Sequence, residues 1–193
     1  MANSIIELCN AALIDLGEEA IFSLTDSTKA ARLCNQRWPA VRDAVLRAHP
    51  WNCACAQVRL AASAGAPAFG FAQAFPLPTD CLRVLRVQCG GALLDEWEAQ
   101  GGSILCGEPG PLDLTYVRRL DDPRLYDPLL CEALTARLSA TLAYPLTAST
   151  ALGQAFWSLY AEKLREARGV DAREAAPPAA PQPTTWLAAK LGG

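Results

Sequence analysis

Residues 26–51, DSTKAARLCNQRWPAVRDAVLRAHPW, decide the fold that this sequence predicts. At about 100° per residue, the apolar side chains of this stretch gather on one side of a helix and the charged side chains on the other. The pattern indicates an amphipathic helix whose apolar side packs on a core. The apolar side consists of Ala30, Cys34, Trp38, Val41, Val45 and Ala48, and the opposite side of Arg32, Gln36, Asp43 and Arg47.

Capping residues and prolines set the expected limits of this helix. The side-chain oxygens of residues 25–27 suit the free N–H groups of a first turn, and Pro50 disfavours helical geometry at His49. Pro39 inside the helix removes a hydrogen bond and costs roughly 3 kcal/mol. Because the apolar side keeps its phase across Pro39, we expect one kinked helix rather than two helices that meet at Trp38 and Pro39.

Arginines recur every five residues along this helix, so they spiral around it: Arg32, Arg37, Arg42 and Arg47. Asp43 precedes Arg47 by four residues, the favourable order for a surface ion pair. Two interpretations stay open, namely solvated arginines with surface ion pairs, or contacts with acidic groups of a neighbouring subunit. The candidate subunit or portal interface on this helix is therefore Arg32, Arg37, Asp43 and Arg47.

The composition of the 193 residues indicates one soluble domain with a substantial core, since 51% are hydrophobic. No apolar run approaches the roughly 20 residues that span a bilayer, and the start lacks a secretory signal. We expect a cytoplasmic protein without membrane insertion. Seventeen basic against twenty acidic side chains exclude the basic footprint of a nucleic-acid binder. The eight cysteines are expected to be reduced, mostly buried thiols.

Helical patterns flank a middle segment that is rich in glycine, proline and short apolar runs. A capping box at residues 4–7 opens a first helix, which Gly17 ends. An N-cap aspartate and a first-position proline at residues 127–128 open a third helix, which we expect to stop at residues 144–145. A fourth helix follows over residues 150–173. The middle predicts strands over residues 53–60, 69–75, 82–88, 92–97, 103–106 and 112–118.

These patterns together predict a mainly α fold with a β insertion (α+β). Four helices form one core, a β-rich lobe lies between the second and third helices, and an extended arm follows the fourth. The expected segments are residues 1–51 for the N-terminal helical pair, 52–121 for the β-rich insertion, 122–175 for the C-terminal helical pair and 176–193 for the arm. The expected shared core includes Trp38, Val41, Leu134, Leu138, Phe156 and Leu159.

The C-terminal arm has the composition of an extended linker and an apolar end. Residues 175–185, AAPPAAPQPTT, are too rich in proline to continue a helix. Trp186, Leu187 and Leu191 then follow, and bare apolar side chains of this size reduce solubility. These three residues complete the candidate interface, and we expect them to dock on another subunit.

Motifs of catalysis and metal binding are not recognisable. His49 is the only histidine, which leaves few nucleophile pairs, and we expect it to face the last carbonyls of its helix. Cys53 and Cys55 would share a strand face, but this spacing is not that of structural zinc sites. The glycines of residues 101–110 lack the lysine and hydroxyl of a phosphate loop, so they predict a hairpin turn. We expect no enzymatic activity, cofactor or metal.

A resemblance that spans nearly the whole chain is carried by four stretches and by a second long helix that follows them. The stretches are IIELCNAALIDLGEEAIFSL (residues 5–24), DSTKAARLCNQRWPAVRDAVLRAHPWNCA (26–54), FPLPTDCLRVLRV (75–87) and YDPLLCEALTARLSATLAYPLT (126–147). In this order they resemble the phage tail tubular protein A-like family. These proteins are head-to-tail connectors, or adaptors, of tailed bacteriophages and phage-derived particles. Residues 31–54 are the most specific part, supported by the turn in LPTDCLRVL (77–85), and the long proline-rich arm departs from the family pattern.

The resemblance implies a structural virion protein at the head-to-tail junction, made in the bacterial host cytoplasm. It implies a homo-oligomeric ring of twelve copies beneath the portal protein, followed by tail, stopper or terminator proteins. DNA would pass through this conduit at ejection without specific binding. The alternative is a small cytoplasmic interaction or chaperone-like module, which would form small assemblies and have no portal partner.

Overall fold

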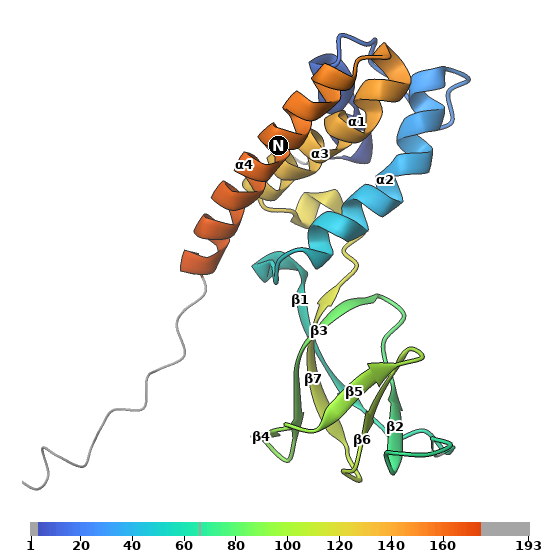
Figure 1. Ribbon diagram of the computed structural model, residues 1–193, viewed down its shortest axis with the longest axis vertical. Helices are drawn as coiled ribbons and strands as arrows, with labels where there is room; N and C mark the ends of the chain where they lie inside the picture. Colours follow the sequence, from blue (N-terminus) through green and yellow to red (C-terminus); the bar gives the residue numbers. More distant parts are fainter. Residues whose placement is uncertain (1–3, 66, 175–193) are drawn as a thin grey trace, which may run out of the picture.

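A computed structural model of the chain describes residues 4–65 and 67–174. These residues form an elongated molecule with helices at one end and strands at the other (Figure 1). The predicted mixed α+β fold is confirmed, since the described residues hold four α-helices and two antiparallel sheets. The helices are α1 (Ile5–Asp15), α2 (Lys29–Arg47), α3 (Pro128–Thr147) and α4 (Thr150–Glu174).

The N-termini of α1 and α2 are fixed by side-chain caps. The predicted capping box is present in α1, where Ser4 Oγ accepts from the Glu7 N–H and the Glu7 carboxylate accepts from the Ser4 N–H. In α2 the N-cap is Thr28, just after the predicted residues 25–27. The reason is that the Asp26 carboxylate accepts from two preceding backbone N–H groups and so is unavailable to the helix.

The stretch that decides the fold forms a single helix, as predicted, with Pro39 inside it. Its apolar side is buried along its length, except that Ala48, after the last helical residue, is only half-buried. Pro39 and Asn35 are both exposed, so the carbonyl that loses its helical donor lies on the solvent side of α2.

Replacing Pro39 by alanine should leave the helical content unchanged and hold or raise the free energy of unfolding, by at most about 3 kcal/mol. Alanine restores the missing N–H donor, and its smaller side chain stays on the exposed side of α2. Urea titration followed by circular dichroism measures this change. A clear loss of stability would mean that the proline supports the packing of α2.

α3 begins at Asp127 and Pro128 as predicted, but it continues past Pro145 to Thr147, so the expected stop at residues 144–145 is wrong. The last carbonyls of the helix find donors there. The Lys29 ammonium donates to the Pro145 carbonyl, and the Thr147 hydroxyl donates 2.7 Å to the Ala143 carbonyl. These bonds offset the one that the proline removes.

α4 lies at the edge of the helical body and packs mainly along α3 (Figure 1). Much of its circumference therefore faces solvent. Leu159 is 37% exposed and its predicted burial is wrong, while Phe156 is half-buried. The other four residues of the predicted core are buried, namely Trp38, Val41, Leu134 and Leu138.

The strands form two antiparallel sheets with orders β1-β7-β3-β4 and β2-β6-β5. Side chains from both sheets meet in one apolar core, which contains Phe75 and Ile104 from one sheet and Val87 and Leu114 from the other. The strands are β1 (Cys55–Leu60), β2 (Gln73–Pro76), β3 (Cys81–Cys89), β4 (Ala92–Leu93), β5 (Trp97–Gln100), β6 (Ser103–Cys106) and β7 (Leu112–Arg118).

The predicted strands at residues 103–106 and 112–118 are confirmed, and the run at residues 92–97 is divided. β4 pairs with β3 in one sheet, whereas β5 pairs with β6 in the other, so the chain crosses between sheets after β4. Gly101 and Gly102 both have positive φ in the two-residue turn between β5 and β6, as the predicted hairpin turn requires. No helix in the described part of the chain is long and apolar enough to cross a bilayer.

Candidate assembly surfaces

The two arginines nearest the start of α2 project to solvent. Arg32 is exposed, and its Nη1 donates 3.1 Å to the Ser27 carbonyl. Arg37 is exposed and has no side-chain hydrogen bond or ion pair to another described residue. Neither guanidinium meets a carboxylate within residues 4–65 and 67–174. Both are therefore free to bind an acidic group of a partner.

Asp43 and Arg47 instead make contacts within the chain, so their predicted ion pair with each other is wrong. The Asp43 carboxylate accepts from Arg42 Nε at 2.8 Å and from Arg119 Nε at 2.9 Å. Arg47 donates to the carbonyl of Leu82 in β3. Because this end of α2 lies beside the strands (Figure 1), β-lobe groups provide closer partners than the next turn of the helix does.

These contacts belong to a polar junction between the helical body and the β lobe. Arg42 also pairs with Asp121, which follows β7. Asp80, before β3, accepts from the Tyr116 hydroxyl at 3.2 Å, and its carbonyl accepts from the Arg119 N–H at 2.6 Å. The junction thus ties α2 to β3 and to the segment that follows β7.

A second junction joins the ends of α2 and α4 through Asp171. Its carboxylate lies 3.0 Å from His49 Nε2 and accepts from the Asn52 N–H at 3.0 Å. The Asn52 side-chain amide donates to the Asp171 carbonyl, and Arg168 donates to the carbonyl of Ala48. His49 therefore bonds a carboxylate, and the expectation that it faces the last carbonyls of its own helix is wrong.

Sequence reasoning missed Asp171, although the sequence holds a signal for it. Tyr160, Ala167 and Asp171 are the buried residues of α4, and their spacing of seven and four places them on one side of the helix. An acidic residue at a core position of an amphipathic helix indicates a buried partner. The partners of Asp171 are His49 and Asn52.

Large apolar side chains are exposed at both ends of the elongated molecule. In the connection between α1 and α2, Phe22 is 94% exposed, and Tyr144 near the end of α3 is 61% exposed. At the far end of the β lobe, Phe69 before β2 is 89% exposed and Leu93 in β4 is 64% exposed. Figure 1 shows these elements at opposite ends. Isolated exposed apolar residues are common, but their position at both ends fits contacts with partners there.

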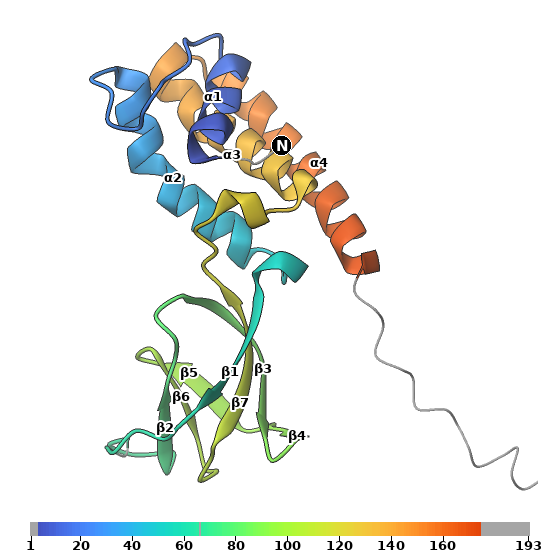
Figure 2. The ribbon, with the colours of Figure 1, turned by 180° about the vertical axis from the view of Figure 1, so that it is seen from behind.

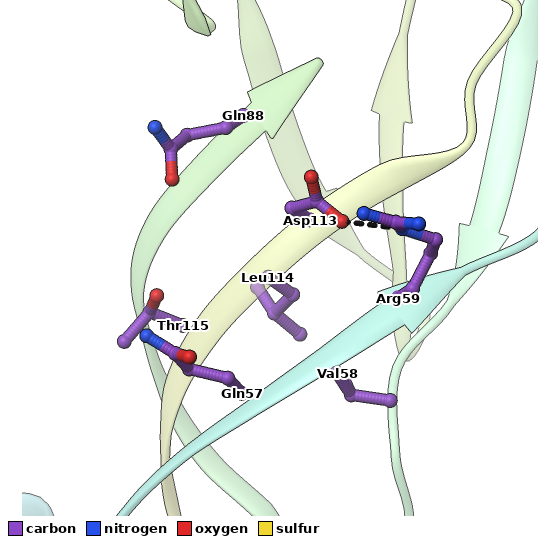
Figure 3. A pocket seen from close by; sticks show the side chains of 7 residues that line it. All are labelled: Gln57, Val58, Arg59, Gln88, Asp113, Leu114 and Thr115. Carbon is purple, nitrogen blue, oxygen red and sulfur yellow. Dashed lines mark hydrogen bonds and ion pairs between the residues drawn. The ribbon is translucent and has the colours of Figure 1, made fainter. Parts of the chain in front are cut away.

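A hollow of about 460 Å³ lies over the outer face of β1, β7 and β3 (Figure 3). Its titratable side chains are Arg59 and Asp113, whose Nε and carboxylate are 2.7 Å apart. The Arg59 guanidinium lowers the pKa of the Asp113 carboxyl, mainly through this hydrogen bond. A carboxylate held ionised does not act as an acid near neutral pH. The hollow is lined by Gln57, Val58, Arg59, Gln88, Asp113, Leu114 and Thr115.

No group of three or more potential metal-ligating side chains occurs within the described ranges. Cys53 lies in a short 3₁₀ helix and Cys55 begins β1, so the two do not share a strand face as predicted. Burial raises the pKa of both thiols, which favours the protonated form that binds metals poorly. The expectation of mostly buried cysteines holds for Cys9, Cys34, Cys106 and Cys131, whereas Cys55 is exposed.

No protein-family model matches this chain. No curated protein matches it either. Trp186, Leu187 and Leu191, the remaining predicted interface residues, lie outside the described residues.

Proposed function

We propose that this chain is the subunit of a head-to-tail connector, which forms a ring beneath the portal of a tailed phage or a phage-like particle. In this proposal the β lobe is an insertion in a four-helix body, and the ring forms a conduit through which DNA passes to the tail. The resemblance of residues 31–54 to the connector family supports the proposal, as does the order of two helices, a β-rich segment and two helices.

The observation that carries the proposal is the exposure of apolar side chains at both ends of an elongated molecule. A connector subunit touches one ring above and another below, so it needs an adhesive surface at each end. Phe22 at the helical end and Phe69 at the β-lobe end meet this need. The junctions at Asp43 and Asp171 support it as well, because a rigid subunit keeps the two ends at a fixed separation.

The charge of the chain fits a conduit that DNA crosses without being held. The net charge is −3, and a strongly basic lining would bind the phosphate backbone through counterion release. The exposed cations of α2 occupy one side of one helix only. We therefore expect no sequence-specific or tight DNA binding.

Electron microscopy of the purified protein, alone and mixed with its portal, tests the proposal. Rings with a central opening, or density for this chain beneath a portal, are the expected result. Small assemblies that do not bind the portal would instead favour an interaction or chaperone-like module and contradict the proposed connector function.

Truncation tests the predicted role of the arm. A chain that ends at Ala175 should keep its helical content but assemble poorly into rings or onto the portal, because the anchors Trp186, Leu187 and Leu191 are removed. Burying each of these side chains contributes roughly 1.5–3 kcal/mol before the cost of ordering the arm. Trp186→Ala should cause much of the same loss, and Lys190→Ala is the matched control. Particles that the truncated chain completes normally would refute this role.

A further inference from the structure

Charge is divided sharply between the first two helical segments. Residues 4–26 contain five acidic side chains and no lysine or arginine, whereas residues 27–48 contain five basic side chains and one acidic. Of the five basic groups, Arg42 pairs with Asp43 and Asp121, and Arg47 donates to the Leu82 carbonyl of the β lobe. The other three are exposed at the first turns of α2. The chain therefore carries two surfaces of opposite charge.

The acidic α1 face is the exposed side of α1, together with the two residues after its C-cap turn. At its edge toward α3, the Asp15 carboxylate accepts from the Ser139 hydroxyl at 3.1 Å. Its acids make no ion pair with any lysine or arginine of the described residues. Ile14 lies among them and is 65% exposed, so the face combines charge with an apolar centre. The acidic α1 face consists of Glu7, Ala11, Ile14, Asp15, Glu18 and Glu19.

The basic α2 face is the solvent side of the first three turns of α2. Its cations find only backbone carbonyls within the described chain, since Lys29 donates to Pro145 and Arg32 to Ser27. Ala40 gives it a small apolar patch beside the charges. The basic α2 face consists of Lys29, Arg32, Gln36, Arg37 and Ala40, all of them exposed.

The acidic α1 face and the basic α2 face lie at the same end of the molecule. α1 runs toward the end that is distant from the β lobe, and α2 starts there and runs back (Figure 2). Within α1 the acidic face extends about 12 Å from Glu7 to Asp15, at 1.5 Å per residue, and Glu18 and Glu19 follow the end of the helix. The basic α2 face extends about 16 Å from Lys29 to Ala40. The C-terminal end of the acidic α1 face and the start of the basic α2 face are thus both at the end of the molecule distant from the β lobe (Figure 2).

We propose that the acidic α1 face of one copy binds the basic α2 face of a second copy, with the two helices antiparallel. Glu18 pairs with Lys29 and Asp15 with Arg32, while Ile14 and Ala11 pack between the charges. Two different, complementary surfaces on one molecule give a heterologous contact, which closes into a ring when the rotation between copies allows it. If the ring axis is parallel to the long axis of the molecule, the acidic α1 face of one copy lies at the same height as the basic α2 face of the next copy. This inference rests on the ring of the proposed function and names its lateral contact.

A second copy fits these observations better than a nucleic acid does. A phosphate backbone would account for the basic α2 face but would leave the acidic α1 face and Ile14 without a partner. It would also be repelled by the five acids of residues 4–26. The same chain supplies both complementary surfaces in equal number.

Charge reversal tests the contact on the full chain. One variant combines Arg32→Glu with Arg37→Glu, and a second combines Glu18→Lys with Glu19→Lys. The control combines Arg165→Glu with Arg173→Glu, exposed positions on α4, and changes the net charge as the first variant does. Self-association is measured by sedimentation velocity over a range of protein and salt concentrations, and thermal melting verifies that each variant is folded.

Each reversed variant alone should self-associate at least about tenfold more weakly than the wild type, because attraction becomes repulsion at every contact. An equimolar mixture of the two should recover most of this loss, since each copy then meets an opposite face. Wild-type association should weaken with salt, and the control should stay within about threefold of the wild type.

The outcomes separate this inference from the proposed function. If the wild type associates and the reversed variants associate equally well, or if their mixture fails to recover the lost association, the lateral contact lies elsewhere. That result would contradict this inference but not the proposed ring. A wild-type chain that stays monomeric at every concentration, also with the portal, overturns the ring and the contact together. If Arg32→Glu with Arg37→Glu abolishes binding to duplex DNA while leaving association intact, the basic α2 face serves nucleic acid and the inference is wrong.

Discussion

Replacing Val41 by aspartate is expected to lower the free energy of unfolding by about 3–5 kcal/mol. Val41 is 5% exposed and lies in the apolar cluster that all four helices share. The substitution removes a buried apolar side chain and leaves a carboxylate without a partner in its place. Domains of this size are stable by about 5–15 kcal/mol, so a large part of the variant should be unfolded in mild urea.

The neighbouring position supplies the matched control. Ala40 precedes Val41 on the same helix but is exposed, so Ala40→Asp adds the same charge to solvent and should cost less than about 1 kcal/mol. Both variants are compared with the parent by urea titration at a protein concentration low enough to suppress association. Equal midpoints for the two variants would show that the apolar side of α2 does not face the core.

Features that depend on neighbours in sequence could be predicted from the sequence. The capping box of α1, the continuous apolar side of α2 and the start of α3 at Asp127 all follow from residues within a few positions of each other. Local patterns of this kind limit the conformations of the chain before tertiary packing acts. The order of two helices, a β-rich segment and two further helices could therefore be predicted from the sequence.

Features that depend on distant partners could not be predicted. The spacing of Asp43 and Arg47 favours an ion pair on an isolated helix, but Arg119, 76 residues after Asp43, lies close enough to take the carboxylate. The division of the strands into two sheets is equally non-local, because the run at residues 92–97 contains no sign that it changes sheet. Leu159 fits a helical apolar pattern, yet α4 lies at the edge of the body.

The candidate surfaces likewise contain some residues that could be predicted from the sequence and others that could not. Arg32 and Arg37 were identified as interface candidates from their recurrence, and their exposure agrees with that role. Glu18 and Ile14 were not identified, because the sequence does not reveal that Ile14 stays exposed on α1 or that α1 ends where α2 begins. Knowing that the acidic α1 face and the basic α2 face share one end of the molecule requires knowing the path of the chain between α1 and α2.

Asp171 is the charged group with the largest expected effect on stability. It is 6% exposed and accepts hydrogen bonds from the His49 side chain and the Asn52 backbone N–H. His49 in turn packs edge-to-face on Trp51, with ring centroids 4.8 Å apart. These contacts hold the last turns of α4 against the point where the chain leaves α2 for the β lobe.

Asp171→Ala should therefore lower the free energy of unfolding by about 2–4 kcal/mol, because it leaves the part-buried Asn52 N–H and His49 ring without their acceptor. Arg173→Ala, an exposed change two residues later on α4, should stay within about 0.5 kcal/mol of the parent. A double-mutant cycle with His49→Ala should give a coupling energy of about 1 kcal/mol or more, since the two side chains are in direct contact. A coupling energy near zero, or an Asp171→Ala midpoint equal to that of Arg173→Ala, would show that α4 is held by its packing on α3 alone. The carboxylate would then contribute nothing to joining the helical body to the lobe.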